Sequence, residues 1–405
     1  MAGWTVARRA RSYTEPAMTE DKPSLQIHLI AGEASGDRHA AELLRELRKL
    51  YPRARFGGVG GRHLKAAGQE QLFDLAEHAV VGLTDVLLNY RKFKRLFDRL
   101  AADIEARQPD AVIFVDFPGF NLRLAARLRR RLPTTKLIYY ISPQVWAWKA
   151  GRAKQMEAIL DHLLVIFRFE KDWFAERAPR LPVSWPGHPV LDRWDDDAAG
   201  ISPEDGAERV ALLPGSRRRE IEAHLPIVAE AARQMALARP GLKFVLLAAD
   251  MERRQQIERM LERKGLGHLP LEIRMGYALT HLSRCRLALV ASGTATLECA
   301  VAGLPMLILY KVNPLTYWVG RRLVKLPYIG MVNVIAGRKI MPEFLQDNAD
   351  AGKLAEAARR LLDSPEALEK MKGELAAVRA TLGEPGVNAR AASAVRDVIE
   401  GRKAG

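Results

Sequence analysis

The stretch LQIHLIAGEASGD, Leu25–Asp37, indicates how this chain folds. Its first seven residues form a short apolar run, which predicts a buried strand. A glycine-rich turn follows at Gly32–Asp37, and helical periodicity then extends from Arg38 to Leu50. Strand, turn and helix in this order are typical of a mostly parallel sheet that helices cover on both faces.

The same alternation recurs further along the chain. It predicts strands at Ala111–Val115, Lys136–Ile141 and Leu163–Phe167, and helices at Leu122–Leu132 and Arg152–Leu160. An acidic stretch rich in helix and strand breakers, Asp195–Gly206, interrupts the pattern as a linker would. The alternation then restarts with strands at Arg209–Leu213, Lys243–Ala248 and Leu287–Ala291, and a helix from about Ser216 to Ala238.

These segments predict two α/β domains with a cleft between them, where ligands bind beyond the carboxyl ends of the strands. We expect a disordered tail over residues 1–22 and a first Rossmann-like domain over 23–194. A linker over 195–207 leads to a second Rossmann-like domain over 208–349. Helices over 350–405 are expected to pack back across the domains.

Composition limits the classes of protein that this chain can be. The 405 residues are 48% hydrophobic and 27% charged, which is typical of globular domains and excludes a disordered chain. No apolar run reaches the roughly 18 residues that a membrane-spanning helix needs. Two cysteines, Cys285 and Cys299, provide neither a disulfide framework nor a metal cluster. The basic N-terminus lacks an apolar core, so we expect no secretory signal and a cytosolic protein.

The formal net charge of +15 favours a polyanionic partner: a nucleic acid, an anionic lipid or a phosphorylated substrate. No recognisable nucleic-acid-binding motif is present, so we expect no nucleic-acid partner.

Two turns in the second domain are candidate anion sites. Gly215, Ser216 and Arg217 follow a predicted strand where a helix begins, so backbone N–H groups and a guanidinium are available to a phosphate. The alternative is an ordinary serine cap with solvated arginines. A second turn repeats the arrangement with Ser292, Gly293, Thr294 and Thr296, and adds a carboxylate at Glu298 that suits ribose hydroxyls. Two such turns favour a nucleoside diphosphate, and neither a Walker loop nor a GxGxxG turn is present.

The first domain supplies the candidate base. Asp116 directly follows an apolar strand, so it stands at the carboxyl end of that strand and is placed to act as a general base toward a hydroxyl. The alternative is that Asp116 or Asn121 caps the next helix. Trp146 and Trp148, on another strand-end loop, suit contact with a sugar or an acyl chain, or form a hydrophobic plug. His188 is expected to be structural, and Asp195–Asp197 to be solvated linker and not a metal site.

Residues Val80–Leu100 alternate apolar and basic side chains in the pattern of a helix at an anionic bilayer surface. The alternative is a helix that faces the core and solvates its basic side. The expected membrane contacts are Arg91, Lys92, Phe93, Lys94 and Arg95.

Six segments in this order resemble one family, the lipid-A-disaccharide synthases. They are Ala31–Asp37, Asp116–Asn121, Ser142–Trp148, Leu212–Arg217, Ala291–Glu298 and Asn333–Arg338. The resemblance runs from about Leu25 to Gln346. It implies the GT-B fold and transfer of 2,3-diacylglucosamine from UDP to the 6-hydroxyl of 2,3-diacylglucosamine 1-phosphate, with inversion to a β-1,6 disaccharide.

The resemblance also implies roles for single residues. Asp116 is the expected base, and Arg217, Glu298, Asn333 and Arg338 join the two turns as expected UDP contacts. The expected contacts with the acceptor or its lipid are Glu33, Ser35, Asp37, Asn121, Trp146 and Trp148. No metal and no other cofactor are expected, and the enzyme is expected at the inner face of the cytoplasmic membrane.

One segment departs from the family. Phe167-Arg168-Phe169-Glu170 lacks the proline that usually precedes Phe-Glu, which leaves a role for Glu170 open. Two rival interpretations also stay open at this point. One is another GT-B enzyme that uses a UDP-sugar, either an epimerase or a peptidoglycan-precursor transferase. The other is a basic membrane-binding protein without catalytic activity.

Overall fold

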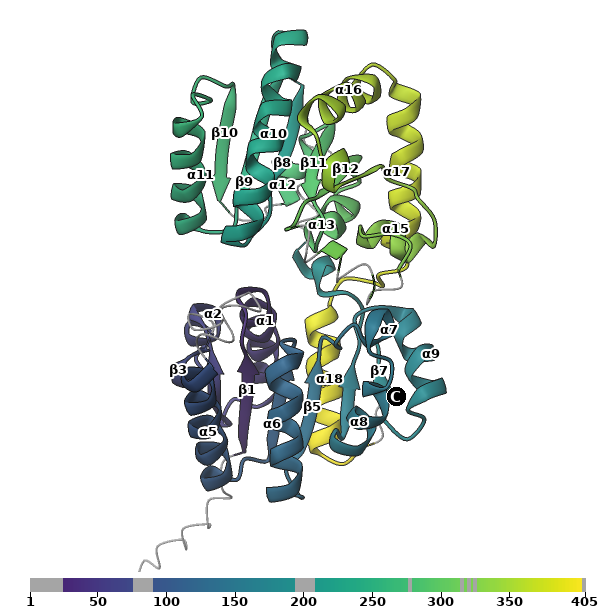
Figure 1. Cartoon of the computed structure of the whole chain (residues 1–405). Coiled ribbons are helices and arrows are strands. Elements are labelled where there is room, and N and C mark those ends of the chain that lie inside the picture. The colour runs from purple at the N-terminus through teal and green to yellow at the C-terminus, as the bar shows by residue number, and fades with distance from the viewer. Residues whose placement is uncertain are drawn as a thin grey trace, which may run out of the picture.

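The computed structural model describes residues 25–75, 90–193, 208–275, 279–313, 317–318, 322 and 326–402. The tail predicted over 1–22 and the linker predicted over 195–207 lie outside these residues. The described part contains two parallel sheets, each covered by helices on both faces (Figure 1). This is the two-domain α/β fold predicted from the sequence.

The first sheet has seven parallel strands in the order β3-β2-β1-β4-β5-β6-β7. The strands are β1 Gln26–Ala31, β2 Arg55–Gly60, β3 Glu70–Asp74, β4 Ala111–Val115, β5 Lys136–Tyr140, β6 His162–Leu164 and β7 Val183–Ser184. All five side chains of β4 are buried, as the apolar run predicts for a strand covered on both faces. Ala31 of β1 pairs with Val115 of β4, so these two strands end side by side.

Helices cover the two faces of this sheet. On one face Phe114 and Tyr139 pack with residues of α5 Tyr90–Arg107, α6 Pro118–Arg131, α8 Arg152–Ile159 and α9 Arg168–Arg177. On the other face Ile113 and Tyr140 pack with residues of α1 Ala34–Leu50 and α18 Val387–Ile399. The short helices α2 Arg62–Ala66 and α7 Val145–Trp148 and the 3-10 helix η1 Pro189–Arg193 complete the described part of this domain.

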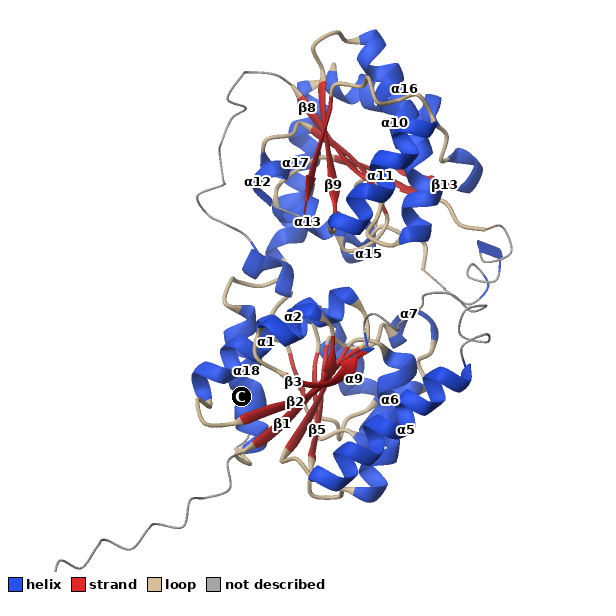
Figure 2. Ribbon diagram, turned by 90° about the vertical axis from the view of Figure 1, so that its left-hand side faces the viewer, coloured by secondary structure: helices blue, strands red, loops and turns tan. Residues whose placement is uncertain are grey.

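The second sheet has six parallel strands in the order β10-β9-β8-β11-β12-β13. They are β8 Arg209–Leu213, β9 Lys243–Ala248, β10 Leu271–Met275, β11 Leu287–Ala291, β12 Met306–Tyr310 and β13 Glu343–Leu345. One face packs against α10 Arg218–Ala238, α11 Met251–Arg263 and α16 Ala351–Leu362. The other packs against α12 Leu279–Ser283, α13 Ala295–Val301, α15 Met331–Ala336 and α17 Pro365–Ala380. Figure 2 shows one sheet in each domain, viewed from the side.

Helix α18 belongs to the end of the chain but packs on the first domain (Figure 1). Its N-terminus is held by Asp192 of η1. The two carboxylate oxygens of Asp192 accept hydrogen bonds from the backbone N–H groups of Gly386 (2.7 Å), Val387 (2.9 Å) and Asn388 (2.7 Å), and from the Asn388 side chain (2.8 Å). A carboxylate that caps a helix in this way satisfies donors that would otherwise be unpaired.

Several details of the sequence prediction were wrong. The strand predicted at Leu163–Phe167 ends at Leu164, and Phe167 instead precedes α9. By contrast, the helix predicted from about Ser216 to Ala238 is confirmed, and it begins at Arg218. Strand β2 was not predicted, because its glycines are typical of a turn. In the structure a Cβ atom on Gly58 would lie 2.2 Å from the carbonyl oxygen of Leu29, so glycine is what lets β2 pair closely with β1.

We predict that Asp192→Ala weakens the docking of α18. The variant leaves three backbone N–H groups without their acceptor, and hydrogen bonds to a charged group typically contribute about 1.5–3 kcal/mol. The free energy of unfolding in urea is expected to fall by about this amount. Asp192→Asn, which keeps a single acceptor oxygen, is expected to lose less. An unchanged unfolding midpoint in Asp192→Ala would contradict the prediction.

Candidate active site

The ends of β1 and β4 bring the glycine-rich turn against the Asp116 turn. A Cβ atom on Gly32 would lie 2.1 Å from the Phe117 ring, so no larger residue fits there. A Cβ atom on Gly36 would lie 3.7 Å from the Cβ atom of Asp116. Gly32 therefore lets the Phe117 ring approach this turn closely, whereas an added Cβ atom on Gly36 would make only ordinary van der Waals contact.

Asp116 and Phe117 both have a left-handed backbone, with φ angles of +50° and +49°. Non-glycine residues keep this conformation only where the surroundings hold them in it. Here the hydroxyl of Tyr139 and the side-chain amide of Asn121 (2.7 Å) both donate hydrogen bonds to the carbonyl oxygen of Asp116. Asn121 is fully buried and positions the backbone of Asp116, and the acceptor contact predicted for it stays a prediction.

The carboxyl group of Asp116 has the protonation behaviour of a general base. Burial and the negative charge of Glu33 together raise the pKa of Asp116 to about 6. A hydrogen bond from Phe117 and the positive charge of Arg217 oppose this rise. A base is most effective when its pKa lies near the working pH. At neutral pH Asp116 is therefore mostly ionised and still basic enough to accept a proton.

Arg217 reaches from the second domain to the first. Its guanidinium donates hydrogen bonds to Glu33 of the first domain (2.7 Å) and to Glu220 of α10 (3.2 Å). The carboxylate of Glu220 also accepts hydrogen bonds from the backbone N–H groups of Ser216 (3.1 Å) and Arg217 (3.2 Å). The expectation that these N–H groups are free for a phosphate was thus wrong for this state, because Glu220 occupies them.

Gly215 completes this turn. Its φ angle is +121°, and a Cβ atom there would lie 2.6 Å from the Cβ atom of Glu220. Glycine is therefore needed both for the backbone conformation and for the close approach of Glu220.

The second predicted turn follows β11. The hydroxyl of Ser292 donates to the carbonyl oxygen of Ile329 (2.9 Å) and that of Thr296 to Gly293 (2.8 Å), so these side chains fix the backbone. Gly293 and Thr294 lie exposed between them, and nothing lies within 4 Å of a Cβ atom placed on Gly293. This turn therefore offers open backbone to a ligand, while its hydroxyl groups are engaged internally.

Glu298 lies on α13 behind this turn and is almost fully buried. One carboxylate oxygen accepts a hydrogen bond from Arg193 of η1 (3.1 Å), and the other has no hydrogen-bond partner in the described part of the chain. Burial raises the pKa of Glu298 to about 7, and the charge of Arg193 opposes this shift. Arg193 also lies 3.7 Å from Glu42 and 3.5 Å from the His39 ring on α1, so it links the two domains.

Three residues predicted as ligand contacts make hydrogen bonds or ion pairs within the protein, and their predicted contacts with ligands stay predictions. The carboxylate of Asp37 accepts hydrogen bonds from the N–H groups of Gly61 (2.7 Å), His63 (2.9 Å) and Leu64 (3.1 Å), which caps α2. Asn333 is fully buried. Its side-chain N–H groups donate hydrogen bonds to Met341 and Glu343, and its side-chain oxygen accepts hydrogen bonds from the N–H groups of Ile340 and Met341. Arg338 is exposed and pairs with Glu374. By contrast, Ser35 is exposed on the first turn of α1.

The tryptophans of α7 differ from each other. The Trp146 indole donates a hydrogen bond to Glu170 (3.0 Å), whose carboxylate also accepts from the N–H groups of Phe167 (3.0 Å) and Ile166 (3.1 Å). Burial raises the pKa of Glu170 to about 7. Glu170 thus fixes Trp146 without the proline that the family usually has. Trp148 is 44% exposed and carries the Lys149 ammonium 4.2 Å above its ring.

His188 has the structural role expected from the sequence. Its ring nitrogen Nδ1 accepts a hydrogen bond from the N–H group of Val190 (3.1 Å), and burial lowers the pKa of His188 to about 3. The imidazole is therefore neutral at physiological pH.

The basic segment predicted to contact the membrane is described only in part. Residues 76–89 lie outside the described residues, and so does the side chain of Lys92. Arg91, Lys94 and Arg95 are exposed on α5, and Phe93 is half-buried. Further along the helix, Leu100 is fully buried and Phe97 packs edge-on against Phe120 at 5.3 Å. The C-terminal part of this segment is therefore a helix that faces the core, with its basic side solvated.

Three functional residues were missed from the sequence. Arg193 and Glu220 belong to no motif that we singled out, and their importance depends on contacts between distant elements. Tyr139 was recognised only as part of a strand. One signal was available: Glu220 stands three residues after the residue that caps α10, the usual position of an acidic partner in a helix cap.

Two further properties concern the described residues as a whole. None of their helices combines the length and the apolar content needed to cross a bilayer. Within the same residues, no three His, Cys, Asp or Glu side chains are grouped closely enough to hold a metal ion.

Two solved structures with a similar architecture share little sequence with this chain. A putative UDP-N-acetylglucosamine 2-epimerase from Listeria monocytogenes matches with a TM-score of 0.63 at 14% identity, covering 94% of this chain and 98% of that one. The glycosyltransferase of kitacinnamycin matches with a TM-score of 0.61 at 15% identity, covering 93% and 100%. These likenesses establish the GT-B type of fold.

Sequence relatives are more specific. The lipid-A-disaccharide synthase of Geobacter sulfurreducens is 40% identical over 388 residues, which cover 94% of this chain and 99% of the relative. That of Myxococcus xanthus is 37% identical over 382 residues, covering 92% and 97%. The family model described as lipid-A-disaccharide synthetase matches residues 27–398. With an interdomain site on a GT-B fold and a family match over nearly its whole length, the chain belongs to the lipid-A-disaccharide synthetase family.

Proposed function

We propose that this enzyme transfers 2,3-diacylglucosamine from UDP to the 6-hydroxyl of 2,3-diacylglucosamine 1-phosphate, forming a β-1,6 disaccharide and UDP. Family membership supports the reaction type. The single observation that carries the assignment of roles is the ion pair of Arg217 and Glu33. It brings the anion-binding turn of the second domain to the turn of the first domain that holds the base.

Asp116 is the general base in this proposal. It accepts the proton of the acceptor 6-hydroxyl while that oxygen attacks the anomeric carbon from the side opposite UDP, which inverts the configuration. The pKa near 6 and the rigid left-handed backbone suit this role. A positioned base typically accelerates such a step about 10²–10⁴-fold.

Arg217 and the two turns of the second domain bind UDP. The N–H groups of Ser216 and Arg217 now donate hydrogen bonds to the carboxylate of Glu220. A diphosphate that displaced this carboxylate would accept the same hydrogen bonds. Gly215 gives the backbone room. The open backbone at Gly293 and Thr294, which the hydroxyls of Ser292 and Thr296 hold in place, adds a second place for the nucleotide. Fixed donors around a leaving phosphate stabilise the charge that develops there.

Glu298 is the proposed ribose contact. Its second carboxylate oxygen is buried and lacks a partner among the described residues, and such an oxygen is destabilising unless a donor reaches it. A ribose hydroxyl is a donor of the right kind. Arg193 holds the first oxygen, favours the ionised carboxylate, and so fixes the direction of the second.

The lipid substrates place the enzyme at a membrane in this proposal, at the inner face of the cytoplasmic membrane. The exposed cations Arg91, Lys94 and Arg95 support an anionic surface as partner. On the acceptor side Glu33, Ser35 and the α7 tryptophans, Trp146 and Trp148, remain the proposed contacts.

The reaction is tested by incubating the protein with the UDP-diacylglucosamine donor and the 1-phosphate acceptor and identifying products by mass spectrometry. We expect a disaccharide 1-phosphate and UDP, and turnover lowered about 10²–10⁴-fold in Asp116→Asn. Because Asp116 must be ionised to accept a proton, kcat/KM is expected to fall about tenfold per pH unit below about pH 6. Conversion of UDP-N-acetylglucosamine to an epimer, without disaccharide, would replace this proposal by the epimerase alternative.

Arg217→Ala is predicted to weaken UDP binding by about 1.5–3 kcal/mol, the usual contribution of hydrogen bonds to charged groups. Arg217→Lys is expected to recover only part, because an ammonium cannot reproduce a planar fork of donors. Arg218→Ala is the matched control, since Arg218 is 75% exposed and pairs with Glu222 on the same helix. Titration calorimetry with UDP measures all three. If Arg217→Ala and Arg218→Ala bind UDP with equal affinity, Arg217 does not bind the phosphate.

Neutralising Arg91, Lys94 and Arg95 together, each to Gln, is predicted to reduce binding to anionic vesicles and to slow turnover on vesicle substrate. Each basic residue near such a surface contributes about 1 kcal/mol. Turnover on detergent-dispersed substrate is expected to change less. The control replaces Arg53, Lys65 and Arg131, three exposed cations elsewhere on the same domain. If both triple variants sediment with vesicles as the parent does, membrane contact lies elsewhere.

A further inference from the structure

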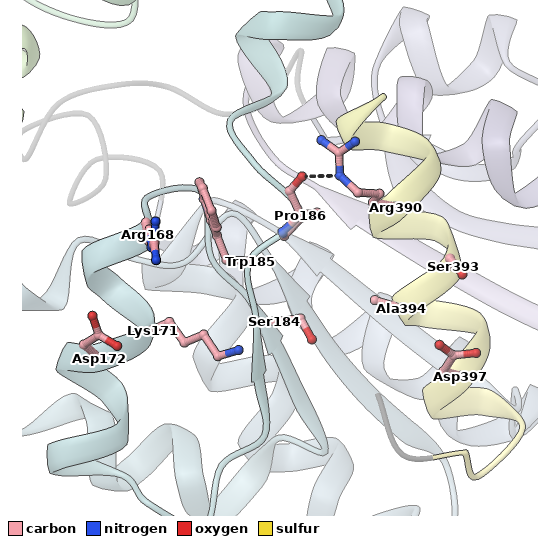
Figure 3. A pocket seen from close by; sticks show the side chains of 10 residues that line it. All are labelled: Arg168, Lys171, Asp172, Ser184, Trp185, Pro186, Arg390, Ser393, Ala394 and Asp397. Carbon is pink, nitrogen blue, oxygen red and sulfur yellow. Dashed lines mark hydrogen bonds between the residues drawn. The ribbon is translucent and has the colours of Figure 1, made fainter. Parts of the chain in front are cut away.

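The first domain has a recess that the proposed reaction does not use. It has a volume of about 750 Å³. Its walls are α9, α18 and the residues Ser184, Trp185 and Pro186 at the end of β7 (Figure 3). Strands β5 and β6 separate β7 from β4, the strand that leads to Asp116. The recess is therefore distinct from the site that holds the base.

Two cations on α9 line one wall of the recess and are uncommitted. Arg168 and Lys171 are three residues apart, so they project from the same face of the helix. Neither makes a hydrogen bond or an ion pair with any residue that the structure describes, although Arg168 lies 5.9 Å above the Trp185 ring. In Figure 3 the Lys171 ammonium points across the recess toward Ser184.

A third cation, Arg390 of α18, is held rigidly at the opposite wall. Its guanidinium donates hydrogen bonds to the carbonyl oxygens of Pro186 (2.8 Å) and Pro385 (2.7 Å), and also to that of Glu384 (Figure 3 draws the Pro186 contact). These acceptors are neutral, so they fix the side chain without cancelling its charge. A guanidinium has five N–H donors, so donors remain for an anion.

The acidic residues of the recess do not balance these charges. Asp397 already faces two cations outside the recess, Arg402 at 3.4 Å and Arg396 at 3.6 Å. That leaves one acidic side chain, Asp172, beside Arg168, Lys171 and Arg390. The recess is therefore positive overall and suits an anion.

The remaining lining suits a small polar group attached to that anion. The hydroxyl of Ser184 is within hydrogen-bonding distance of His162 Nε2 (2.9 Å), and burial lowers the pKa of His162 to about 4, so this partner is uncharged at neutral pH. The Trp185 indole donates to the carbonyl oxygen of Ile166 (3.2 Å), which fixes its ring as part of the wall. Aromatic rings and hydroxyls are common surfaces for sugars, and the volume lies within the usual range for small-ligand sites.

From this lining we propose that the recess binds a phosphate monoester, with the phosphate on Arg168 and Lys171 and the attached group beside Trp185. The proposal does not depend on the glycosyl transfer. The same chemistry is present in a sugar phosphate and in the headgroup of phosphatidic acid.

The test uses the full-length protein with saturating UDP, so that the nucleotide site is filled. Glucose 6-phosphate is titrated by calorimetry, with glucose as the probe that lacks the phosphate. We expect binding of glucose 6-phosphate alone, weakened about tenfold or more in the Arg168→Gln, Lys171→Gln double variant. Lys171→Arg, which keeps the charge, is expected to retain most of the affinity. Lys65→Gln, an exposed cation on the other side of the domain, is the control and is expected to bind normally.

A parallel arm uses vesicles of equal parts phosphatidylcholine and phosphatidic acid. All proteins in this arm also carry Arg91→Gln, Lys94→Gln and Arg95→Gln, which removes the contact of α5 with anionic vesicles that is proposed above. One supporting outcome is that the double variant loses vesicle binding, Lys65→Gln keeps it, and glucose 6-phosphate does not bind. This outcome identifies a lipid headgroup as the source of the phosphate. Binding of glucose 6-phosphate identifies a soluble ligand. The proposal is overturned if neither probe binds, or if the double variant binds as the parent does. Disaccharide formation is measured on the same variants and is expected to be unchanged, so failure here leaves the transfer reaction unaffected.

Discussion

The geometry of the site depends on strand order in the two sheets. In each sheet the order reverses once, between β1 and β4 in the first and between β8 and β11 in the second. At such a point the chain leaves neighbouring strands in opposite directions, so the turns beyond their carboxyl ends separate and leave room for a ligand. Asp116 and Glu33 follow the strands at the first reversal, and Arg217 and the Ser292–Thr296 turn follow those at the second. The two halves of the site thus occupy the same place in two similar folds.

Charge then joins the halves. Arg217 meets Glu33 beside Asp116, and Arg193 joins α1 to Glu298 of α13. Each arginine therefore pairs with an acid of the other domain, Arg217 with Glu33 and Arg193 with Glu298. Both acids are proposed ligand contacts. In this state Glu220 and Glu33 fill places suited to a phosphate. These carboxylates therefore balance the charge of Arg217 and occupy the N–H groups of its turn, the donors that are proposed for the nucleotide.

Much of this could be predicted from sequence because the signals were local. Apolar runs identified β1, β4, β8 and β11, and the turns after them identified Asp116, Arg217 and the Ser292–Thr296 segment. What local patterns cannot show is where a polar side chain finds its partner. Asp37, Asn121 and Asn333 stand in motifs yet bond to the backbone of other elements, so their structural role depends on tertiary contacts. Arg193 was missed for the same reason, and β2 because its glycines serve close packing and not a turn.

The position of α18 has a consequence for the order in which the protein folds. This helix is made about 200 residues after β7, yet its residues Ala391, Ala392 and Val395 cover the face of the first sheet that contains Ile113 and Tyr140. At typical rates of translation the ribosome needs roughly 10–40 s to synthesise that interval. Throughout it, α1 can already pack on this face of the nascent first domain, but the part that α18 later covers stays exposed. Chaperone binding during synthesis would protect this face, and the domain reaches its final packing only after the second domain has emerged.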